Sequence, residues 1–462
     1  MRKQLKELHG RKFVRDTLVL QVATFIQAAS YLLTSVLTKW YLGMHDMGRW
    51  NAARDLFSVA YFLVTMGVVS ATVSRYSEGV GRQDRASCVA ALAGMLKLGL
   101  VSGALVTVAA FLFGPAISQH YYSDRDVGHY AAILCFAGLF EVVRGITVVA
   151  LQGTRQMREF AWFDILSSLL RLGLVFGALA GGWGMPGVVW AFVAHMALAG
   201  GMALHFYGRA RRGDPRLAPP PLRDVIAAVP RASVVAIFGL SYLMALNKGM
   251  NTLVPMAGGL LIPGMESLKS TGDAFKANAA YKIGYVLSWG LGLAMTGVAQ
   301  SLLPALGVRM GRTDTPFEAM GGLLKRVSLT AGTLMVGATL LSVPVMYLVI
   351  RYLYGAGAED SFRYYCWLTA GNLFIGFTCV IDAFYIYSRR LKLAVRINFV
   401  LAAMAMLGIV LGAKLYGPIG VSAAVALTDS LGLVHLVYMW AYFRRAKANA
   451  AATPSNPDLP HD

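Results

Sequence analysis

Long apolar stretches alternate along the chain with short polar or basic segments. Each stretch holds about 20 residues, the length that an α-helix needs to cross the hydrocarbon core of a bilayer. The alternation predicts an all-α polytopic membrane protein with about twelve transmembrane helices, six in each half of the chain. A transmembrane β-barrel is excluded, because its spans are shorter and alternate with a period of two. The expected spans are 17–37, 56–74, 89–113, 130–151, 160–181, 185–206, 225–247, 279–303, 327–350, 364–387, 394–415 and 419–442.

The pattern of spans and loops occurs twice. A Gly-Arg-x-Asp sequence follows the second expected span of each half, at residues 81–84 and 311–314. Two further matches keep the same order: Thr154–Arg158 with Ser388–Lys392, and Gly184–Val188 with Gly417–Val421. The duplication predicts two pseudo-symmetric six-helix lobes. Because an even number of spans returns the chain to its starting side, both lobes have the same orientation, an architecture of transporters.

A basic, proline-containing break separates the two halves. The arginines between Gly208 and Arg212 would stop translocation, and Pro219–Pro221 would form a stiff linker. The end of the chain is polar and contains prolines, so we expect it to be disordered. The expected organisation is a basic N-terminus at 1–16, an N-lobe at 17–207, a linker at 208–224, a C-lobe at 225–443 and a tail at 444–462.

The composition indicates lipid as the solvent. Hydrophobic residues make up 57% of the chain and charged residues 14%, against about 25% charged residues in soluble domains. The net charge of +19 alone would suggest binding to nucleic acid. The lysines and arginines concentrate in alternate loops, however, which is the positive-inside bias of membrane proteins. The distribution therefore predicts that both termini lie in the cytoplasm, and it indicates no nucleic-acid partner.

Each half has one long connection between its first and second spans. Lys39–Arg54 is hydrophilic and contains glycine, and we expect an irregular outer loop there. Asn247–Ala277 contains several prolines and glycines, too many for one regular helix. It is either an extracellular loop or the bent end of a helix that faces a cavity.

Charged side chains at membrane depth are costly, so they usually face a cavity or a partner. Glu141 and Arg144 lie three residues apart on the fourth span, where they can pair. One interpretation is an internal ion pair that locks this helix to its neighbours. In the other, Arg144 and Arg171 supply positive charge to a central cavity for an anionic head group, because guanidinium stays charged and matches phosphate oxygens. The candidate sites for a coupling ion or proton are Asp164, Asp382 and Asp429.

Three more cationic residues lie near the expected outer ends of the spans. Lys248 and Lys282 are placed at the seventh and eighth spans, and Arg54 opens the second. Long cationic side chains in such positions usually extend to the membrane surface. If they turn inward instead, they join Arg144, Arg171 and Glu141 in lining a head-group cavity.

The chain carries no recognisable catalytic signature. It has no phosphate-binding Gly-x-x-x-x-Gly-Lys-Ser/Thr loop and no nucleophile elbow. The four cysteines fall in or beside apolar spans without metal-ligand spacing, and we expect them to be packing residues. His195, in the middle of a span, is expected to be a hydrogen-bonded interior histidine. We therefore expect no enzyme activity, no cofactor and no metal.

Several segments resemble one family of membrane proteins. Leu42–Trp50 and the polar stretch Ser74–Gly79 are similar to the opening of bacterial polysaccharide flippases of the multidrug/oligosaccharidyl-lipid/polysaccharide exporter superfamily. Three segments of the second half resemble the same family, namely Ala280–Lys282, Asp382–Tyr385 and Gly417–Gly420. The family commonly has a glycine before the tyrosine of the eighth span, where this chain has Ala280.

The resemblance implies two six-helix lobes that open alternately to the two sides of the bacterial inner membrane. It implies a polyprenyl-diphosphate-linked oligosaccharide as cargo, flipped from the inner to the outer leaflet for surface polysaccharide or O-antigen synthesis. The implied partners are this lipid-linked oligosaccharide and membrane lipids, and such a pathway would add a polysaccharide polymerase and a chain-length regulator.

Other functions compete with this one. A cation-coupled multidrug exporter of the same superfamily would use an acidic site, which Glu141 or the membrane-depth aspartates could supply. A carrier of the major facilitator type also has six plus six spans, but its second-loop pattern differs from Glu78–Asp84. A membrane-embedded glycosyltransferase would need a larger outer loop than any expected here.

Overall fold

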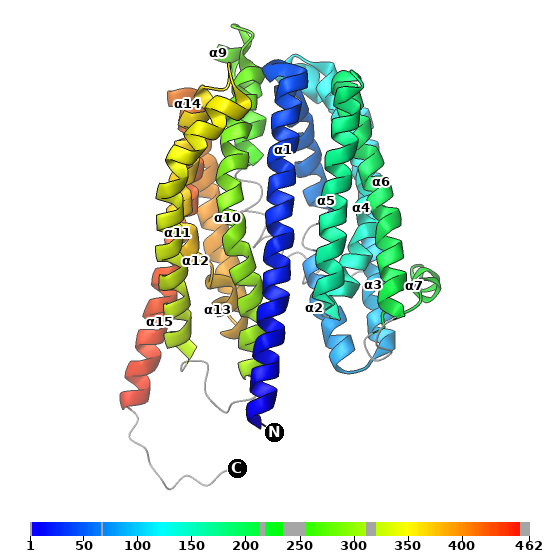
Figure 1. The fold of residues 1–462 in the computed structure, drawn as a ribbon, viewed down its shortest axis with the longest axis vertical. Coiled ribbons are helices and arrows are strands. Elements are labelled where there is room, and N and C mark those ends of the chain that lie inside the picture. The colour runs from blue at the N-terminus through cyan, green and yellow to red at the C-terminus, as the bar shows by residue number, and fades with distance from the viewer. Residues whose placement is uncertain are drawn as a thin grey trace.

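The computed structural model describes residues 2–65, 68–154, 156–212, 218–233, 256–310 and 320–452. Within these ranges the chain forms helices and no β-strand. The long helices run side by side along the long axis of the molecule (Figure 1). The all-α fold that the apolar stretches predict is thereby confirmed.

The first half of the chain supplies one side of the bundle. Its helices are α1 (Arg2–Thr65), α2 (Val68–Gly81), α3 (Arg85–Tyr122), α4 (Arg125–Gly153), α5 (Met157–Ala180), α6 (Gly184–Arg211) and the short α7 (Leu222–Ala228).

The second half supplies the other side. Its described elements are η1 (Ile262–Gly264), α9 (Glu266–Lys269), α10 (Ala274–Met310), α11 (Gly321–Val349), the π-helix η3 (Ile350–Tyr354), α12 (Asp360–Thr378), α13 (Ile381–Tyr387), α14 (Leu391–Leu431) and α15 (Leu433–Ala452).

Gly43 turns the first helix into a helical hairpin. Its backbone has φ 73° and ψ 177°, which divides α1 into two helical arms. This conformation costs glycine little and is strained for residues with a Cβ. The expectation of an irregular loop over Lys39–Arg54 is therefore wrong. This polar segment is helical up to and beyond Gly43, because the second arm packs inside the protein.

A glycine with positive φ recurs at matching places in the two halves. Gly184, at the start of α6, has φ 61°. Gly417 has φ 60° and ψ −145°, and it divides α14 just before Pro418. These two glycines belong to the repeated segments Gly184–Val188 and Gly417–Val421. The repeat in the sequence thus corresponds to a repeat in backbone geometry.

Seven helical stretches within the described residues are long and apolar enough to cross a membrane. Two of them, Val19–Phe62 and Leu391–Ala448, contain the turns at Gly43 and Gly417. Each of these two therefore corresponds to two of the expected spans. The chain is a multi-pass membrane protein.

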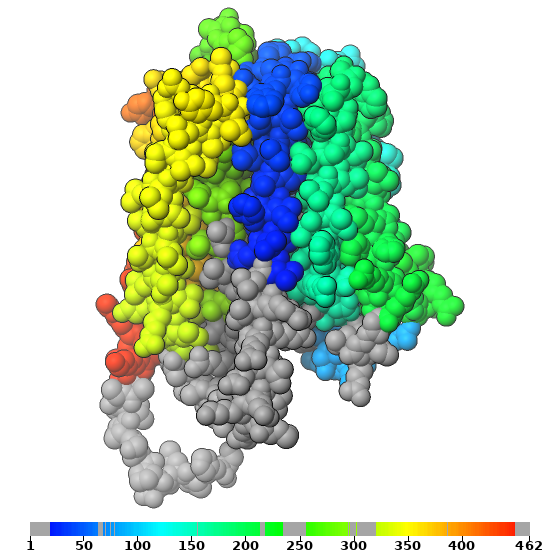
Figure 2. Space-filling view, in the orientation of Figure 1, coloured from blue at the N-terminus to red at the C-terminus, as the bar shows by residue number. Residues whose placement is uncertain are grey.

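Each half of the chain packs around apolar cores of its own. Leu134 and Val188 are fully buried in the first half, and Phe384 and Ile409 in the second. Helix α1 lies between the two groups, where it contacts α5 on one side and α10 on the other (Figures 1 and 2). Residues on the two arms of α1 can therefore face both halves of the protein.

The two halves interlock at the end of the bundle that carries α9, opposite the start of α1 (Figure 1). We refer to it as the α9 end. Phe275 of α10 packs into a core of the first half, while Met47 of α1 packs into a core of the second. Gly48 touches α10 so closely that an added Cβ would lie 1.9 Å from the carbonyl oxygen of Phe275. Only a residue without a side chain permits this contact.

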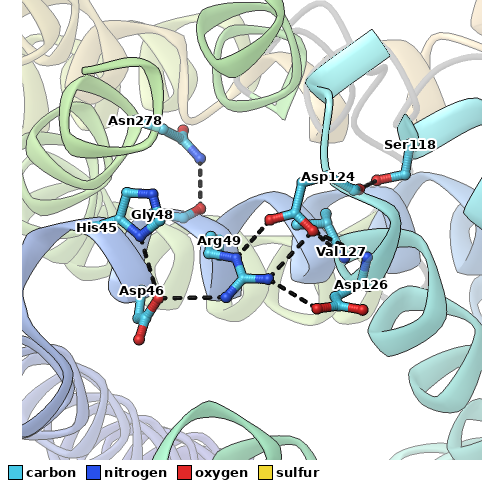
Figure 3. A network of polar contacts seen from close by, with 9 residues as sticks. All are labelled: His45, Asp46, Gly48, Arg49, Ser118, Asp124, Asp126, Val127 and Asn278. Carbon is cyan, nitrogen blue, oxygen red and sulfur yellow. Dashed lines mark hydrogen bonds and ion pairs between the residues drawn. The ribbon is translucent and has the colours of Figure 1, made fainter. Parts of the chain in front are cut away.

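Polar contacts surround the Gly48 contact (Figure 3). Asn278 of α10 donates its side-chain amide to the carbonyl oxygen of Gly48, over 3.1 Å. Arg49 binds both oxygens of Asp124, with Nε at 2.6 Å and Nη2 at 3.2 Å. Asp124 in turn caps α4 by accepting from the backbone amides of Asp126 and Val127. The network joins the α1 hairpin to α4 within the first half, and Asn278 joins it to the second half.

Gly48 is predicted to control how closely the halves approach at this end. A Gly48→Val side chain would overlap backbone atoms of Phe275 and should push α10 away by a few ångström. Spin labels at Arg125 and Ser267, both exposed near this end, would report a longer mean distance by pulsed electron resonance. Gly201→Val is the control, because a Cβ there meets nothing within 4 Å. An unchanged distance in Gly48→Val would show that this contact does not set the separation.

Candidate functional site

A cavity lies between the two halves, where the arms of the α1 hairpin face α5, α6 and α10. Residues from both arms line it, together with side chains from the other three helices. Its lining residues are Tyr31, Thr34, Ser35, Thr38, Met47, Trp50, Asn51, Arg54, Arg171, Val175, Phe192, Lys282 and Val286. The site therefore draws on both halves, as expected for a protein whose lobes move about a central ligand.

All charged side chains among these lining residues are cationic. Arg54 comes from α1, Arg171 from α5 and Lys282 from α10. Hydroxyl groups of Thr34, Ser35 and Thr38 are on the first arm of α1. Three cations and several hydroxyls suit an anionic, oxygen-rich ligand such as a phosphorylated sugar.

Arg171 is buried, and two of its nitrogens find no hydrogen-bond partner among the described residues. Its side chain is among the buried charged residues, with 6% of its surface exposed. The guanidinium stacks over the ring of Tyr31, with 3.6 Å from its central carbon to the ring centroid. Among the side chains that line the cavity, the buried atoms without a hydrogen-bond partner in the described part of the chain are Nε and Nη2 of Arg171 and Nδ2 of the neighbouring Asn51. Buried donors left unpaired cost free energy, so these groups are expected to bind water or an acceptor from a ligand.

Lys282 is held by a carboxylate from the other half of the protein. Its Nζ lies 2.7 Å from Oδ2 of Asp55, and the two side chains are 3% and 4% exposed. Gly259 lies against the pair, since a Cβ there would come within 2.0 Å of Asp55 Oδ2 and 2.4 Å of Lys282 Cε. This ion pair connects α1 to α10 and leaves the positive charges of Arg54 and Arg171 in the cavity.

The cavity has a volume of about 30 Å³, which is space on the scale of a few water molecules. A diphosphate and a sugar would not fit into it. Because the cavity walls come from both halves of the chain, movement of the halves relative to one another would enlarge it. The structure is thus a state in which this site is closed around the cations.

A second charged cluster lies outside the cavity lining. Arg144 donates from Nε to Glu141 over 2.5 Å, and its Nη1 is 3.9 Å from Asp164 of α5. The expected pairing of Glu141 with Arg144 is confirmed. Two carboxylates surround this guanidinium, which favours the interpretation that the cluster joins α4 to α5. His195 contacts Ser167 at 3.1 Å in the interior of the same half, which confirms the expected hydrogen-bonded histidine.

The remaining predicted site residues that the structure describes are not in the cavity lining. Asp382 is exposed on α13. Asp429 of α14 lies against α12, where a Cβ at Gly371 would come within 2.8 Å of its Oδ2. Lys248 lies outside the described residues. Within the part of the chain that the structure describes, no cluster of histidine, cysteine or acidic residues suits a metal ion.

The structure corrects the default interpretation of two cations and adds residues that the sequence did not reveal. Lys282 is buried and does not extend to the membrane surface, and Lys282 and Arg54 both line the cavity. Tyr31 and Asn51 were missed, because nothing in their local sequence distinguishes a cavity-lining side chain from a packed one. The sequence held one signal for this site, namely Asp55 directly after Arg54. An acidic residue beside a cation at membrane depth needs a partner, and that partner is Lys282.

Comparison with known proteins identifies the family. Residues 13–258 match the profile of a family described as polysaccharide biosynthesis protein. The chain belongs to this family. The resemblance of Leu42–Trp50 and Ser74–Gly79 to polysaccharide flippases is thereby confirmed. No curated protein matches the chain by sequence.

Solved structures share the fold of this polysaccharide biosynthesis family member. The lipid II flippase MurJ in an inward closed conformation superposes with a TM-score of 0.66 at 16% identity, over 91% of this chain and 87% of MurJ. An inward-facing multidrug resistance transporter of the MATE family superposes with a TM-score of 0.70 at 14% identity, over 94% of this chain and 99% of the transporter. A mutant form of the Vibrio cholerae MATE transporter VcmN gives 0.64 at 13% identity, over 94% of this chain and 98% of VcmN. At these identities the likeness establishes the fold alone.

The Lys282–Asp55 pair is predicted to stabilise the closed arrangement of the halves. Asp55→Asn leaves a buried ammonium without its carboxylate and should lower the free energy of unfolding by about 3–5 kcal/mol. Lys282→Met should cost a similar amount, while the double variant should lose much less than the sum, because neither charge remains. Thermal unfolding of the purified variants in detergent measures this. Strictly additive losses would show that the two residues do not stabilise each other.

Proposed function

We propose that this protein flips a polyprenyl-diphosphate-linked oligosaccharide from the inner to the outer leaflet of the bacterial inner membrane by alternating access. The observation that carries the proposal is the buried guanidinium of Arg171, whose unpaired donors adjoin a cavity with two further cations. Membership in a polysaccharide biosynthesis family supports a lipid-linked glycan as cargo. The diphosphate is the anion that these cations would bind.

The barrier to unassisted flipping explains why such a cavity is needed. Moving a diphosphate and several sugars through hydrocarbon would expose charges and hydroxyl groups at a cost of many kcal/mol. Arg171 and Arg54 replace part of the hydration of the diphosphate. The hydroxyls of Thr34 and Thr38 donate to backbone carbonyls of α1, and their oxygens accept hydrogen bonds from hydroxyl groups of the sugar. The polyprenyl chain stays in an apolar environment throughout.

A change of partner at Lys282 couples binding of the diphosphate to opening of the lobes. In the closed state the ammonium of Lys282 is paired with Asp55 across the halves. An incoming diphosphate competes with Asp55 for this ammonium, which weakens one of the contacts that hold α1 and α10 together. The lobes then separate at the α9 end, and the head group leaves on that side. With both termini in the cytoplasm, the α9 end faces outward.

A multidrug exporter is the second candidate, since MATE transporters share the fold. The cluster of Glu141 and Asp164 around Arg144 carries one more negative than positive charge and favours this alternative. The cations that line the central cavity oppose it, because they repel the cationic compounds that an acidic exporter site would bind.

Arg171 is predicted to bind the anionic head group directly. Arg171→Ala should weaken binding of a polyprenyl-diphosphate-linked oligosaccharide by about 10-fold or more, as expected for loss of a charge-assisted hydrogen bond. Arg171→Lys should retain part of the affinity because it keeps the charge without the fork of donors. Binding to the purified protein in detergent, measured by native mass spectrometry, tests both variants.

The control for this experiment is Arg231→Ala, which removes an exposed arginine outside the cavity. It should bind the lipid-linked oligosaccharide like the unchanged protein. Equal affinity in Arg171→Ala and Arg231→Ala would contradict the head-group site. Binding of a cationic dye that is lost in Glu141→Gln would favour the exporter instead.

A further inference from the structure

A second recess occupies the opposite faces of two helices that form the cavity. It is lined only by apolar groups and glycine, and its volume is about 440 Å³, within the range of about 300–1,000 Å³ for ligand pockets. Its lining residues are Leu33, Val36, Leu37 and Trp40 of α1, Leu169, Leu172, Gly173 and Phe176 of α5, and Leu353 of η3. We call this recess the α1–α5 groove.

The α1–α5 groove lies at membrane depth and opens sideways, toward the surrounding lipid. Its residues belong mainly to two helices long and apolar enough to span a bilayer, Val19–Phe62 and Met157–Ala180. Helices α1 and α5 are neighbours on the face of the molecule shown in Figure 2. Leu33, Leu169 and Phe176 are exposed large hydrophobic residues, so the groove presents its apolar walls to the surrounding hydrocarbon.

Contacts between α1 and the π-helix close the groove on one side. Trp40 donates its indole Nε1–H to the carbonyl oxygen of Leu353 over 2.6 Å. One residue earlier, Lys39 binds the carbonyl oxygens of Tyr354 and Ala356. The groove is thus bounded by η3 on one side, near the α9 end, and is open on the face that it presents to lipid.

Residues that line the groove alternate with residues that line the cationic cavity along α1 and along α5. On α1, Thr34 and Thr38 line the cavity while Leu33 and Leu37 line the groove. On α5, Arg171 lines the cavity and the next residues, Leu172 and Gly173, line the groove. The stacked side chains of Tyr31 and Arg171 close the seam between the two helices. A cationic site and an apolar site separated by one seam match a single ligand with an anionic head and a hydrocarbon chain.

We infer that the α1–α5 groove binds the isoprenoid units nearest the diphosphate of the lipid-linked oligosaccharide. The inference rests on the proposed function and adds a site for the chain to the site for the head group. With the diphosphate on Arg171, the linkage passes through the seam at Tyr31, and the chain leaves the protein between α1 and α5. Opening of this seam is then part of loading and release.

Gly173 allows the groove to be filled without disturbing other contacts. A Cβ at Gly173 would meet nothing within 4 Å, and the same holds at Gly177 one turn later on α5. Gly173 lines the groove, whereas Gly177 does not. Gly173→Trp should therefore weaken binding of the lipid-linked oligosaccharide by about 10-fold or more, which corresponds to about 1.4 kcal/mol, and should lower its outward exposure in cells. Gly177→Trp should leave it unchanged at equal expression.

A photo-crosslinking residue at Leu172 identifies what occupies the groove. Irradiation of membranes should yield an adduct with the lipid-linked oligosaccharide, and the Gly173→Trp change should abolish that adduct. Phospholipid adducts of equal yield, with or without the lipid-linked oligosaccharide, would overturn the inference by showing an ordinary lipid contact, and so would adducts with a second copy of the chain. If Arg171→Ala abolishes outward exposure while Gly173→Trp behaves like the unchanged protein, the groove assignment fails and the flippase proposal survives. If neither change has an effect, both fail.

Discussion

A buried positive charge in a membrane protein needs a partner, and this requirement organises the centre of the molecule. Three cations line the interface between the halves, yet the described part of the chain gives a carboxylate partner to only one of them, Lys282. Arg171 relies on the ring of Tyr31 and keeps two buried nitrogens without acceptors among the described residues. Desolvating a guanidinium in this way is unfavourable unless an anion or water completes its contacts. The closed site is therefore closely packed, but the positive charge of Arg171 has no carboxylate partner among the described residues.

The same requirement connects the site to the contacts between the halves. Asp55 neutralises Lys282 only while α1 and α10 are together, and the Gly48 contact with Phe275 holds these helices close at the α9 end. In the proposed mechanism, a ligand that brings its own negative charge replaces Asp55 at Lys282 and lowers the cost of separating the halves. The proposal thus couples ligand charge to lobe movement through one lysine.

Much of the fold follows from the sequence, because span length and apolar character are local properties. The repeat of Gly184–Val188 and Gly417–Val421 was visible in the sequence and returns as two glycines with positive φ. The hairpin at Gly43 was not foreseen, since a polar segment looks like a loop unless the packing that keeps it helical is known. The Glu141–Arg144 pair was predictable from spacing on one helix.

The site was only partly predictable, because it assembles from four helices that are distant in sequence. Arg171, Arg54 and Lys282 were among the predicted residues, but which cations face the cavity depends on how the helices rotate in the bundle. Arg144 shows the difficulty. Its position in the middle of a span is that expected of a cavity arginine, yet two carboxylates lie beside it. Tyr31 and Asn51 contribute through tertiary position alone.

Translocation itself is the central claim, and outward exposure of the cargo tests it most directly. In cells lacking this gene, intact spheroplasts would be probed with a glycan-binding protein for polyprenyl-diphosphate-linked oligosaccharides on the outer surface. The account predicts that exposure is lost while the lipid-linked oligosaccharide accumulates inside, and that the gene restores exposure. Unchanged exposure, together with new sensitivity to cationic dyes, would contradict the flippase and favour a drug exporter.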